Sequence, residues 1–187
     1  MQNAVPNGEG GMLAVLGSKV EIIENLLNEN KNNFKAEIAN DNSGGQIVLS
    51  GRNNDIEKLI QVLKFKNVKN IKLPVSAPFH CHLMSNATKI MRNEIQKLNF
   101  QESQNKLISN VTAKEISNKD ALKMLLIDQI ENRVRWRESV VHMINNGVNH
   151  FIEIGHGKVL SGLIKRIDKN VKINTINNES DIKDLNL

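Results

Sequence analysis

The sequence predicts an α/β protein made of two unequal parts. Between residues 8 and 76, apolar runs and turn signals follow the order strand, helix, strand, strand, helix, strand. From residue 77 to residue 178 helices dominate and separate the strands, which is typical of parallel strands with helices over the faces of the sheet. Pro78 marks the boundary, because proline lacks a backbone N–H and holds the preceding residue extended. Residues 179–187 are expected to form a polar tail.

The first part contains four expected strands and two expected helices. Gly17 ends the first strand, and Ser18 can cap the helix that carries Ile23 and Leu26 on its apolar face. Residues 40–45 are a dense turn signal, which predicts a hairpin with a longer loop. The expected strands span residues 11–16, 34–39, 46–50 and 70–75, and the second helix spans residues 53–66. This βαββαβ order predicts a ferredoxin-like unit.

The second part contains about three expected strands and four expected helices. The strands span residues 106–110, 148–154 and 171–176, and the helices span residues 85–98, 120–130, 136–145 and 158–167. In the first of these helices the apolar spacing turns Ile90, Met91, Ile95 and Leu98 inward. Trp136 and several aliphatic faces need a partner surface, so this part is interpreted as a portion of a larger sheet.

Composition indicates a globular protein and argues against several function classes. The chain has 187 residues, 40% of them hydrophobic and 24% charged, and its net charge of +5 is dispersed rather than gathered in a block. With no tyrosine and one tryptophan, few aromatic side chains could stack on bases, so no nucleic-acid partner is expected. A single cysteine fits a reducing compartment. No apolar run approaches the ~18 residues of a membrane span and no signal peptide is recognised, so a cytoplasmic location without a membrane partner is expected.

The segment LPVSAPFHCHLM, residues 73–84, is the strongest candidate for a functional site. A strand breaks at Pro78, and Phe79, His80, Cys81 and His82 then follow at its end, facing the start of a helix. Histidine titrates near neutral pH, so His80 is a candidate general base. The alternative is a structural histidine whose hydrogen bonds are satisfied at a strand end.

Five segments, in order, resemble one family. LPVSAPFHCHLM resembles the histidine segment of malonyl-CoA:acyl-carrier-protein transacylases and of the related acyltransferase domains of polyketide and fatty acid synthases. MQNAVPNGEGGMLAVLG and IANDNSGGQIVLSG resemble parts of the small subdomain of that family, and DQIENRVRW and EIGHGKVLSGLIKRI resemble its C-terminal segments. The resemblance implies that residues 8–76 are a ferredoxin-like small subdomain. It also implies that residues 77–178 are the C-terminal part of an α/β-hydrolase-like large subdomain.

The implied activity is the transfer of a malonyl group from coenzyme A to the phosphopantetheine thiol of acyl carrier protein, in fatty acid biosynthesis and without a bound cofactor. The family uses a serine in a GHSxG elbow, and this sequence contains no G-x-S-x-G. The oxyanion glutamine and the malonyl-binding arginine of the family are also missing. The chain is therefore expected to be truncated and inactive alone, and the alternatives are one half of a split enzyme or a decayed remnant.

The resemblance assigns roles to six residues. It implies that His80 is the base and that the main-chain carbonyl of Gln129 orients it in place of an aspartate. The implied substrate-binding residues are Phe79, Met1, Asn40 and Asn42. For the two asparagines, turn formation is the favoured interpretation, and core filling is compatible with the role of Phe79. Gly44, Arg133 and His156 stand where the family usually has proline.

Other interpretations of the same residues are weaker. Cys81 and His80 are adjacent on an extended segment and should point to opposite faces, so a cysteine–histidine dyad is not expected. His80 and His82 share a face, but no third ligand lies at useful spacing, so no metal site is expected. Residues 155–158 lead into a helix N-terminus, which favours anions. The chain could also be a non-catalytic module that binds acyl carrier protein through lysine-rich helix faces. RNA binding would need aromatic residues on the central strands, which have none.

Overall fold

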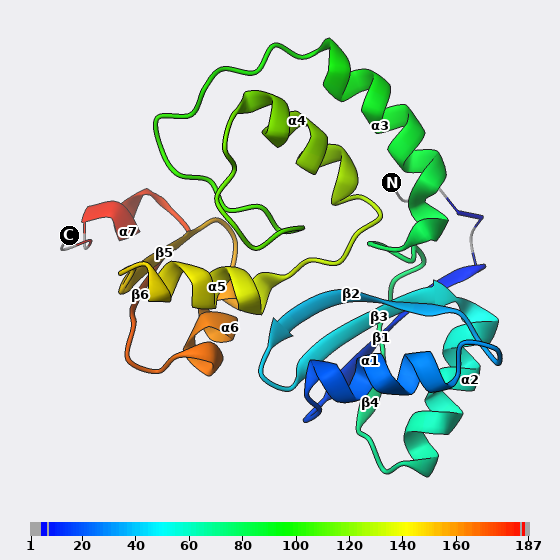
Figure 1. Cartoon of the computed structure of the whole chain (residues 1–187). Coiled ribbons are helices and arrows are strands. Elements are labelled where there is room, and N and C mark those ends of the chain that lie inside the picture. The colour runs from blue at the N-terminus through cyan, green and yellow to red at the C-terminus, as the bar shows by residue number, and fades with distance from the viewer. Residues whose placement is uncertain (1–4, 7, 184, 186–187) are drawn as a thin grey trace.

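The computed structural model describes residues 5–6, 8–183 and 185, and it shows an α/β fold in two parts (Figure 1). The first part has an antiparallel sheet with the strand order β2-β3-β1-β4. Its elements are β1 (Gly10–Leu16), α1 (Val20–Glu29), β2 (Ala36–Ser43), β3 (Gln46–Arg52), α2 (Asn53–Phe65) and β4 (Asn70–Lys72). This element order agrees with the order predicted from the sequence.

The main core lies between this sheet and the helices α1 and α2. Alternate strand residues such as Leu13 and Leu49 meet helix residues such as Ile23 and Leu59, and all four are fully buried. This is the expected result of a two-residue strand period facing two amphipathic helices. The opposite face of the sheet carries a smaller cluster of Met12, Ala39 and Val48, against which Leu73 and Phe79 pack. The predicted histidine segment therefore crosses the face of the sheet that α1 and α2 leave open.

The hairpin between β2 and β3 differs from the prediction. Strand β2 continues to Ser43, and the turn consists of only Gly44 and Gly45, the latter with a left-handed φ of 94°. The asparagines at 40 and 42 therefore lie in a strand rather than in a turn. Two β-bulges bend this strand, and it pairs on its outer edge with Val134, whose N–H donates to the Ala39 carbonyl at 2.8 Å. Pairing on both edges outweighs the turn preference of the Asn-Asp-Asn sequence.

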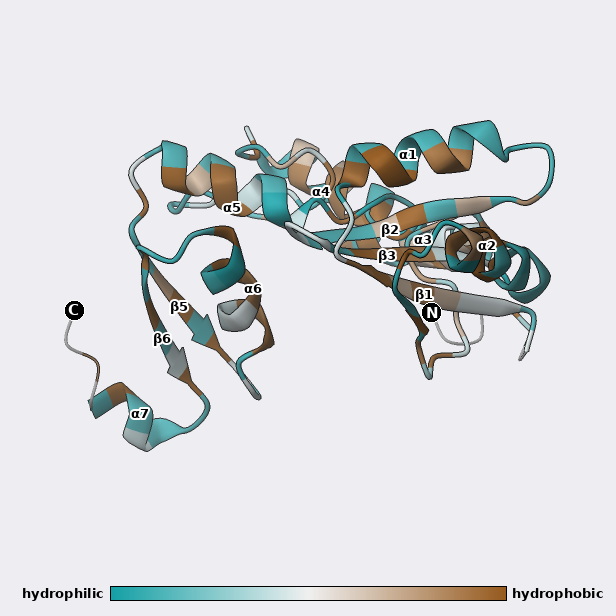
Figure 2. Ribbon diagram, turned by 90° about the horizontal axis from the view of Figure 1, so that it is seen from below, coloured by the Kyte–Doolittle hydropathy of each residue, from teal (hydrophilic) through white to brown (hydrophobic). Residues whose placement is uncertain are grey.

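The second part holds two parallel strands and five α-helices in its described residues. Its elements are a 3-10 turn (His82–Met84), α3 (Ser85–Lys97), α4 (Lys119–Asp128), α5 (Trp136–Asn145), β5 (His150–Ile154), α6 (Val159–Ile167), β6 (Lys172–Ile176) and α7 (Glu179–Lys183). The pairing of β5 with β6 is parallel, as predicted. Val140, Ile164 and Val171 form its core with Trp136 and Phe151. In Figure 2, β5, β6 and α7 lie at the end of the molecule away from the four-stranded sheet.

Two predictions for this part were wrong. Residues 106–110 form no strand and make only an isolated bridge between Ile108 and Glu115. On α3, Ile95 is buried, but Ile90 and Leu98 are 65% and 56% exposed. The apolar face of α3 is thus only partly covered by the described residues. None of the helices in the described ranges is both long and apolar enough to cross a membrane.

Candidate active site

His80 lies in a strained turn and contacts a distant backbone carbonyl. Its φ is 58°, in the left-handed region that residues other than glycine rarely adopt. Its Nδ1 lies 2.7 Å from the carbonyl oxygen of Gln129, the residue that follows α4. Because a carbonyl oxygen only accepts hydrogen bonds, Nδ1 carries a hydrogen, and in the neutral ring Nε2 then keeps its lone pair. Nε2 has no hydrogen-bond partner among the described residues, so it is available to accept a proton.

Three further contacts hold the turn that carries this histidine. Pro78 is fully buried against Gly10, where a Cβ atom would come within 2.3 Å of the proline Cδ. The Ser50 hydroxyl donates to the Phe79 carbonyl at 2.6 Å. The Cys81 thiol donates to the Pro78 carbonyl at 3.1 Å. The turn is therefore fixed to β1 and β3, and glycine is required at position 10 by this close approach.

Phe79 packs between two apolar clusters. On one side it contacts the cluster of Met12, Ala39 and Val48 on the sheet, and on the other it contacts the cluster of Met84, Ala87 and Ile130. The ring therefore contributes to the packing between the sheet and the segments around α3 and α4. It is only half-buried, so part of it remains open beside His80.

The other expected substrate-binding residues are Asn40, Asn42 and Met1, of which the structure describes the two asparagines. Asn40 pairs directly with Val48, so its side chain lies on the face of the sheet that contacts Phe79. Asn42 lies near the end of β2, beside the second bulge. Neither asparagine side chain forms a hydrogen bond with another described residue. Met1 lies outside the described residues. The structure thus brings His80, Gln129 and Phe79 together, with Asn40 on the same side of the sheet.

An open cavity of about 440 Å³ adjoins His80. It is lined by residues from α1, from β2 and from the segment after Gln129, which are Glu24, Leu27, Asn28, Ala36, Glu37, Ile38, Glu131, Asn132 and Arg133. Three of these residues are acidic and one is basic. The histidine is therefore reached from a polar surface formed by both parts of the fold.

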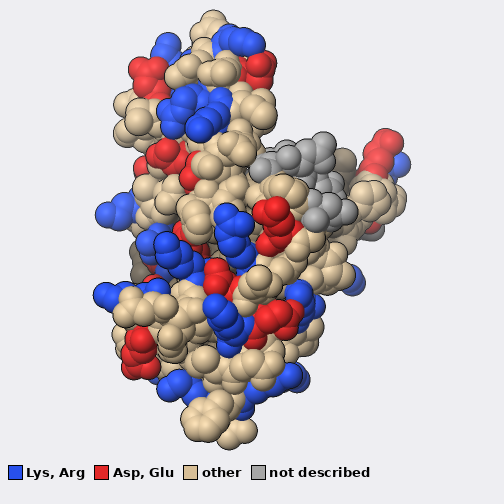
Figure 3. Space-filling model, turned by 90° about the vertical axis from the view of Figure 1, so that its right-hand side faces the viewer, with Lys and Arg blue, Asp and Glu red and all other residues tan. Residues whose placement is uncertain are grey.

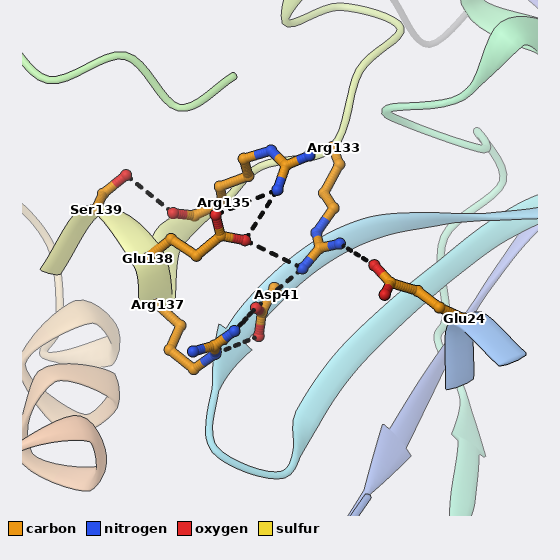
Figure 4. A network of polar contacts seen from close by, with 7 residues as sticks. All are labelled: Glu24, Asp41, Arg133, Arg135, Arg137, Glu138 and Ser139. Atoms are coloured by element: carbon orange, nitrogen blue, oxygen red, sulfur yellow. Dashed lines mark hydrogen bonds and ion pairs between the residues drawn. The ribbon is translucent and has the colours of Figure 1, made fainter. Parts of the chain in front are cut away.

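The segment that supplies the Gln129 carbonyl is tied to the sheet by the Asp41 network, which comprises Glu24, Asp41, Arg133, Arg135, Arg137 and Glu138 (Figure 4). Asp41 in β2 is buried, and its carboxylate accepts from Arg133 Nη2 at 3.0 Å and from Arg137 Nε at 2.9 Å. Arg133 also donates to Glu24 in α1 at 2.8 Å. The hydrogen bond to Asp41 raises the pKa of the Arg137 guanidinium, and burial opposes this rise.

Arg133 therefore has a structural role that sequence reasoning missed. It lines the cavity beside His80 and joins α1, β2 and α5. Asp41 and Arg137 gave no signal in the sequence, because their proximity depends on long-range pairing.

The expected anion site at residues 155–158 is already filled by the chain itself. Glu153 accepts from the backbone N–H groups of Leu160 and Ser161 at 3.1 and 2.7 Å, at the start of α6. Burial raises the pKa of the Glu153 carboxyl, but the hydrogen bonds from Ser161 and Leu160 outweigh this effect and leave the pKa lowered. The Gly157 N–H donates to the Asn177 side chain. The N-terminus of α6 therefore has an internal carboxylate where an anion was expected.

Cys81 and His82 have surroundings that the sequence did not reveal. Cys81 is fully buried, and burial raises the pKa of its thiol to about 11. Its hydrogen bond goes to Pro78 and not to His80, so the two side chains form no dyad. His82 contacts Glu37 of β2 through both its backbone N–H and its Nδ1. Glu37 is distant in sequence, which is why no third ligand was found by spacing.

Comparison with known proteins identifies relatives along nearly the whole chain. No family model matches the sequence. The malonyl CoA-acyl carrier protein transacylase of Bacillus subtilis is 37% identical over 174 residues, which cover 92% of this chain and 55% of that protein. The enzyme of the same name from Staphylococcus aureus is 36% identical and covers 100% of this chain and 61% of its own length.

Solved structures share the fold. An acyl-carrier-protein S-malonyltransferase from Bartonella henselae superposes with a TM-score of 0.93 at 39% identity, covering 98% of this chain and 59% of that one. A malonyl CoA-acyl carrier protein transacylase from Clostridium perfringens gives 0.93 at 36% identity, covering 98% and 58%. The chain therefore has the fold of a corresponding part of these acyltransferases. In sequence it is homologous, over nearly its whole length, to part of the malonyl CoA-acyl carrier protein transacylases, and it spans 55–61% of the two curated relatives.

Proposed function

We propose that this chain carries the histidine side of a transacylase site that moves a malonyl group from coenzyme A to the phosphopantetheine thiol of acyl carrier protein, in fatty acid biosynthesis. The observation that carries the proposal is the contact between His80 Nδ1 and the Gln129 carbonyl, which leaves Nε2 unpaired. The homology to proteins of this name supports the substrates. The sequence has no G-x-S-x-G, so the serine would come from polypeptide outside these 187 residues.

The chemistry assigned to His80 is general acid–base catalysis in two half-reactions. In the first, Nε2 takes the serine proton as the hydroxyl oxygen attacks the malonyl thioester, and the imidazolium returns this proton to the departing coenzyme A sulfur. In the second, Nε2 takes the proton of the phosphopantetheine thiol, whose sulfur attacks the malonyl-serine ester, and the serine oxygen recovers a proton as it leaves. No cofactor is needed for either step.

Gln129 acts through its backbone in this scheme. A carbonyl oxygen at 2.7 Å fixes the imidazole orientation and the tautomer with hydrogen on Nδ1. Its partial negative charge also favours the imidazolium that forms during each proton transfer, as a carboxylate does in a serine–histidine–aspartate triad. Because only the carbonyl is used, the glutamine side chain can change without loss of this function.

The acyl group is proposed to bind beside His80, on the open face of the sheet. Phe79 is packed on both sides, so its ring cannot withdraw easily to admit an α-methyl branch. This rigidity supports a preference for malonyl over a branched acyl group. Asn40 and Asn42, which have unpaired side chains in β2, are proposed to contact the acyl group, and so is Met1, which lies outside the described residues.

The proposed organisation assigns residues 8–76 to a ferredoxin-like small subdomain. The antiparallel order β2-β3-β1-β4 with both helices on one face supports this assignment. Residues 77–178 are proposed to be the C-terminal part of an α/β-hydrolase-like large subdomain, followed by the tail. Exposed apolar residues on α3 and β5, such as Ile90 and Ile154, support further polypeptide covering this part.

Acyl carrier protein is the proposed macromolecular partner. A related structure, at 32% identity and a TM-score of 0.90, is described as a type II polyketide acyl-carrier protein in complex with its malonyl-transacylase. The net charge of +5 would favour an acidic partner. Figure 3 shows basic and acidic side chains interspersed on one face of the molecule, which argues for local contacts rather than one large basic patch.

The test joins this chain, by fusion or co-expression, to the portion of the Bacillus subtilis relative that it does not match, where we expect the serine to lie. The readout is malonyl transfer from malonyl-CoA to acyl carrier protein. We expect His80→Ala to lower the transfer rate by about 10²–10⁴-fold, whereas His156→Ala, at an exposed site, should leave it unchanged. Transfer that survives His80→Ala would refute the assignment. An absence of transfer with intact, salt-sensitive binding of acyl carrier protein would favour a non-catalytic binding module.

A further inference from the structure

Three metal-ligating side chains meet beside the turn that carries His80. Glu37 comes from β2, and Cys81 and His82 precede α3. Glu37 Oε, Cys81 Sγ and His82 Nδ1 all lie within 4.8 Å of one another. Ligand atoms around a single tetrahedral zinc ion are about 3.3–3.8 Å apart, given bond lengths of about 2.0–2.3 Å. Only small side-chain movements would therefore place all three atoms around one ion.

The chemistry of this group suits zinc more than a hard cation. A thiolate, an imidazole nitrogen and a carboxylate oxygen are the three protein ligands that zinc uses, whereas calcium and magnesium take oxygen ligands. The site is reachable, because the side chains of His82 and Glu37 are 56% and 43% exposed while the sulfur lies beneath them. Solvent could supply the fourth ligand.

Burial raises the pKa of the Cys81 thiol, and one backbone hydrogen bond opposes this rise. Cys81 directly precedes the 3-10 turn, and the Leu83 N–H forms a hydrogen bond to its sulfur that favours the charged form. Glu37 and Glu131 place negative charge near the sulfur, which disfavours a free thiolate but attracts a cation. A divalent ion would remove the cost of this buried charge. His80 is not required, because its Nδ1 is occupied by the Gln129 carbonyl.

We propose that Glu37, Cys81 and His82 bind one zinc ion, with water as the fourth ligand. On binding, the Cys81 thiol loses its proton to solvent and gives up its hydrogen bond to Pro78 as the Zn–S bond forms. Glu37 and His82 exchange their mutual contact for bonds to the metal. The ion would link β2 to the residues that follow His80. This proposal does not depend on the transacylase function.

The experiment uses the untagged chain, stripped with a chelator and titrated with Co²⁺ as a spectroscopic probe and then with Zn²⁺. We expect one equivalent of Co²⁺ to produce a thiolate-to-cobalt charge-transfer band that Zn²⁺ abolishes. Glu37→Gln and His82→Ala change exposed side chains, so they should fold and should each weaken binding by about tenfold or more. Cys81→Ser should remove the band.

The matched control is His156→Ala, which removes an exposed histidine from another part of the fold and should leave the titration unchanged. Two outcomes would overturn the proposal. One is the absence of a charge-transfer band in the folded wild-type chain. The other is a band whose metal affinity is the same in Glu37→Gln and His82→Ala as in the wild type, because the thiol would then bind the metal without these partners.

Discussion

Replacement of Asp41 by asparagine is expected to destabilise the fold more than any comparable change of an exposed acid. The Asp41 side chain is 1% exposed and lies between two guanidinium groups. Asp41→Asn keeps the size of the residue and one acceptor oxygen, but it removes the negative charge. Arg133 and Arg137 would then face each other without the carboxylate that separates them.

The size of the effect follows from the contacts. Removing one partner of a buried ion pair costs about 3–5 kcal/mol, because the remaining charge is left without compensation. Here Arg133 keeps its contacts with Glu24 and Glu138, and the Arg137 side chain is 30% exposed. Both features reduce the penalty, so we expect the free energy of unfolding to fall by an amount near the lower limit, about 3 kcal/mol.

Urea unfolding followed by circular dichroism measures this loss, with Asp120→Asn as the matched control. Asp120 is exposed in the first turn of α4 and has no ion pair with a described residue, so its replacement should cost less than about 1 kcal/mol. At this chain length about 3 kcal/mol corresponds to a fall in Tm of roughly 6–12 °C. Equal losses for the two variants would refute the view that the Asp41 network joins the two parts.

Three further outcomes follow from the site geometry. Gly10→Ala would bring a Cβ atom within 2.3 Å of the Pro78 ring, so the urea midpoint should fall by an amount equivalent to about 1–3 kcal/mol, and an unchanged midpoint would contradict this packing. The Cys81 thiol, with its pKa raised from 9.0 to about 11, should be alkylated at about pH 8 some hundredfold more slowly in the folded chain than in the unfolded chain; similar rates would show that the thiol is not buried. Glu153→Gln should lower Tm at neutral pH. The pKa of Glu153 is lowered in the folded state, so its charge stabilises the fold above the unfolded-state pKa, and this stabilisation is lost as pH falls through the folded-state pKa. The Tm values of the two proteins should therefore become equal in acid. A Tm difference that stays constant with pH would argue against the charge as the cause.

The elements predicted best are those whose signals are local. The apolar spacing in α1 and α2 and the glycine after α5, Gly147, determine helices without reference to distant residues. The hairpin was mispredicted because the turn preference of Asn40 and Asn42 is local, whereas the pairing of β2 with β3 and Val134 is not. The α3 prediction failed for a related reason: spacing identifies an apolar face but not what covers it.

The site was predictable only in part. His80 was selected because Pro78 was predicted to end a strand in front of it, although β4 already ends at Lys72, and the resemblance to a family suggested a partner at Gln129. Nothing in the residue spacing brings that carbonyl to the imidazole, since the two residues lie 49 positions apart in the sequence. The same limit applies to Glu37, which meets His82 only through the placement of β2. Sequence patterns therefore selected the candidate histidine and missed most of its surroundings.

The most direct test of the central claim is the protonation state of the His80 ring in the folded chain, measured by ¹⁵N–¹H correlation NMR of the histidine side chains. The account predicts that the neutral ring carries its hydrogen on Nδ1 and keeps a free lone pair on Nε2, because the Gln129 carbonyl can only accept. The exposed ring of His156 serves as the internal reference for an unrestrained histidine. If His80 instead carries its hydrogen on Nε2, or averages between tautomers as His156 does, it is not held as a proton acceptor and the proposed role in acyl transfer fails.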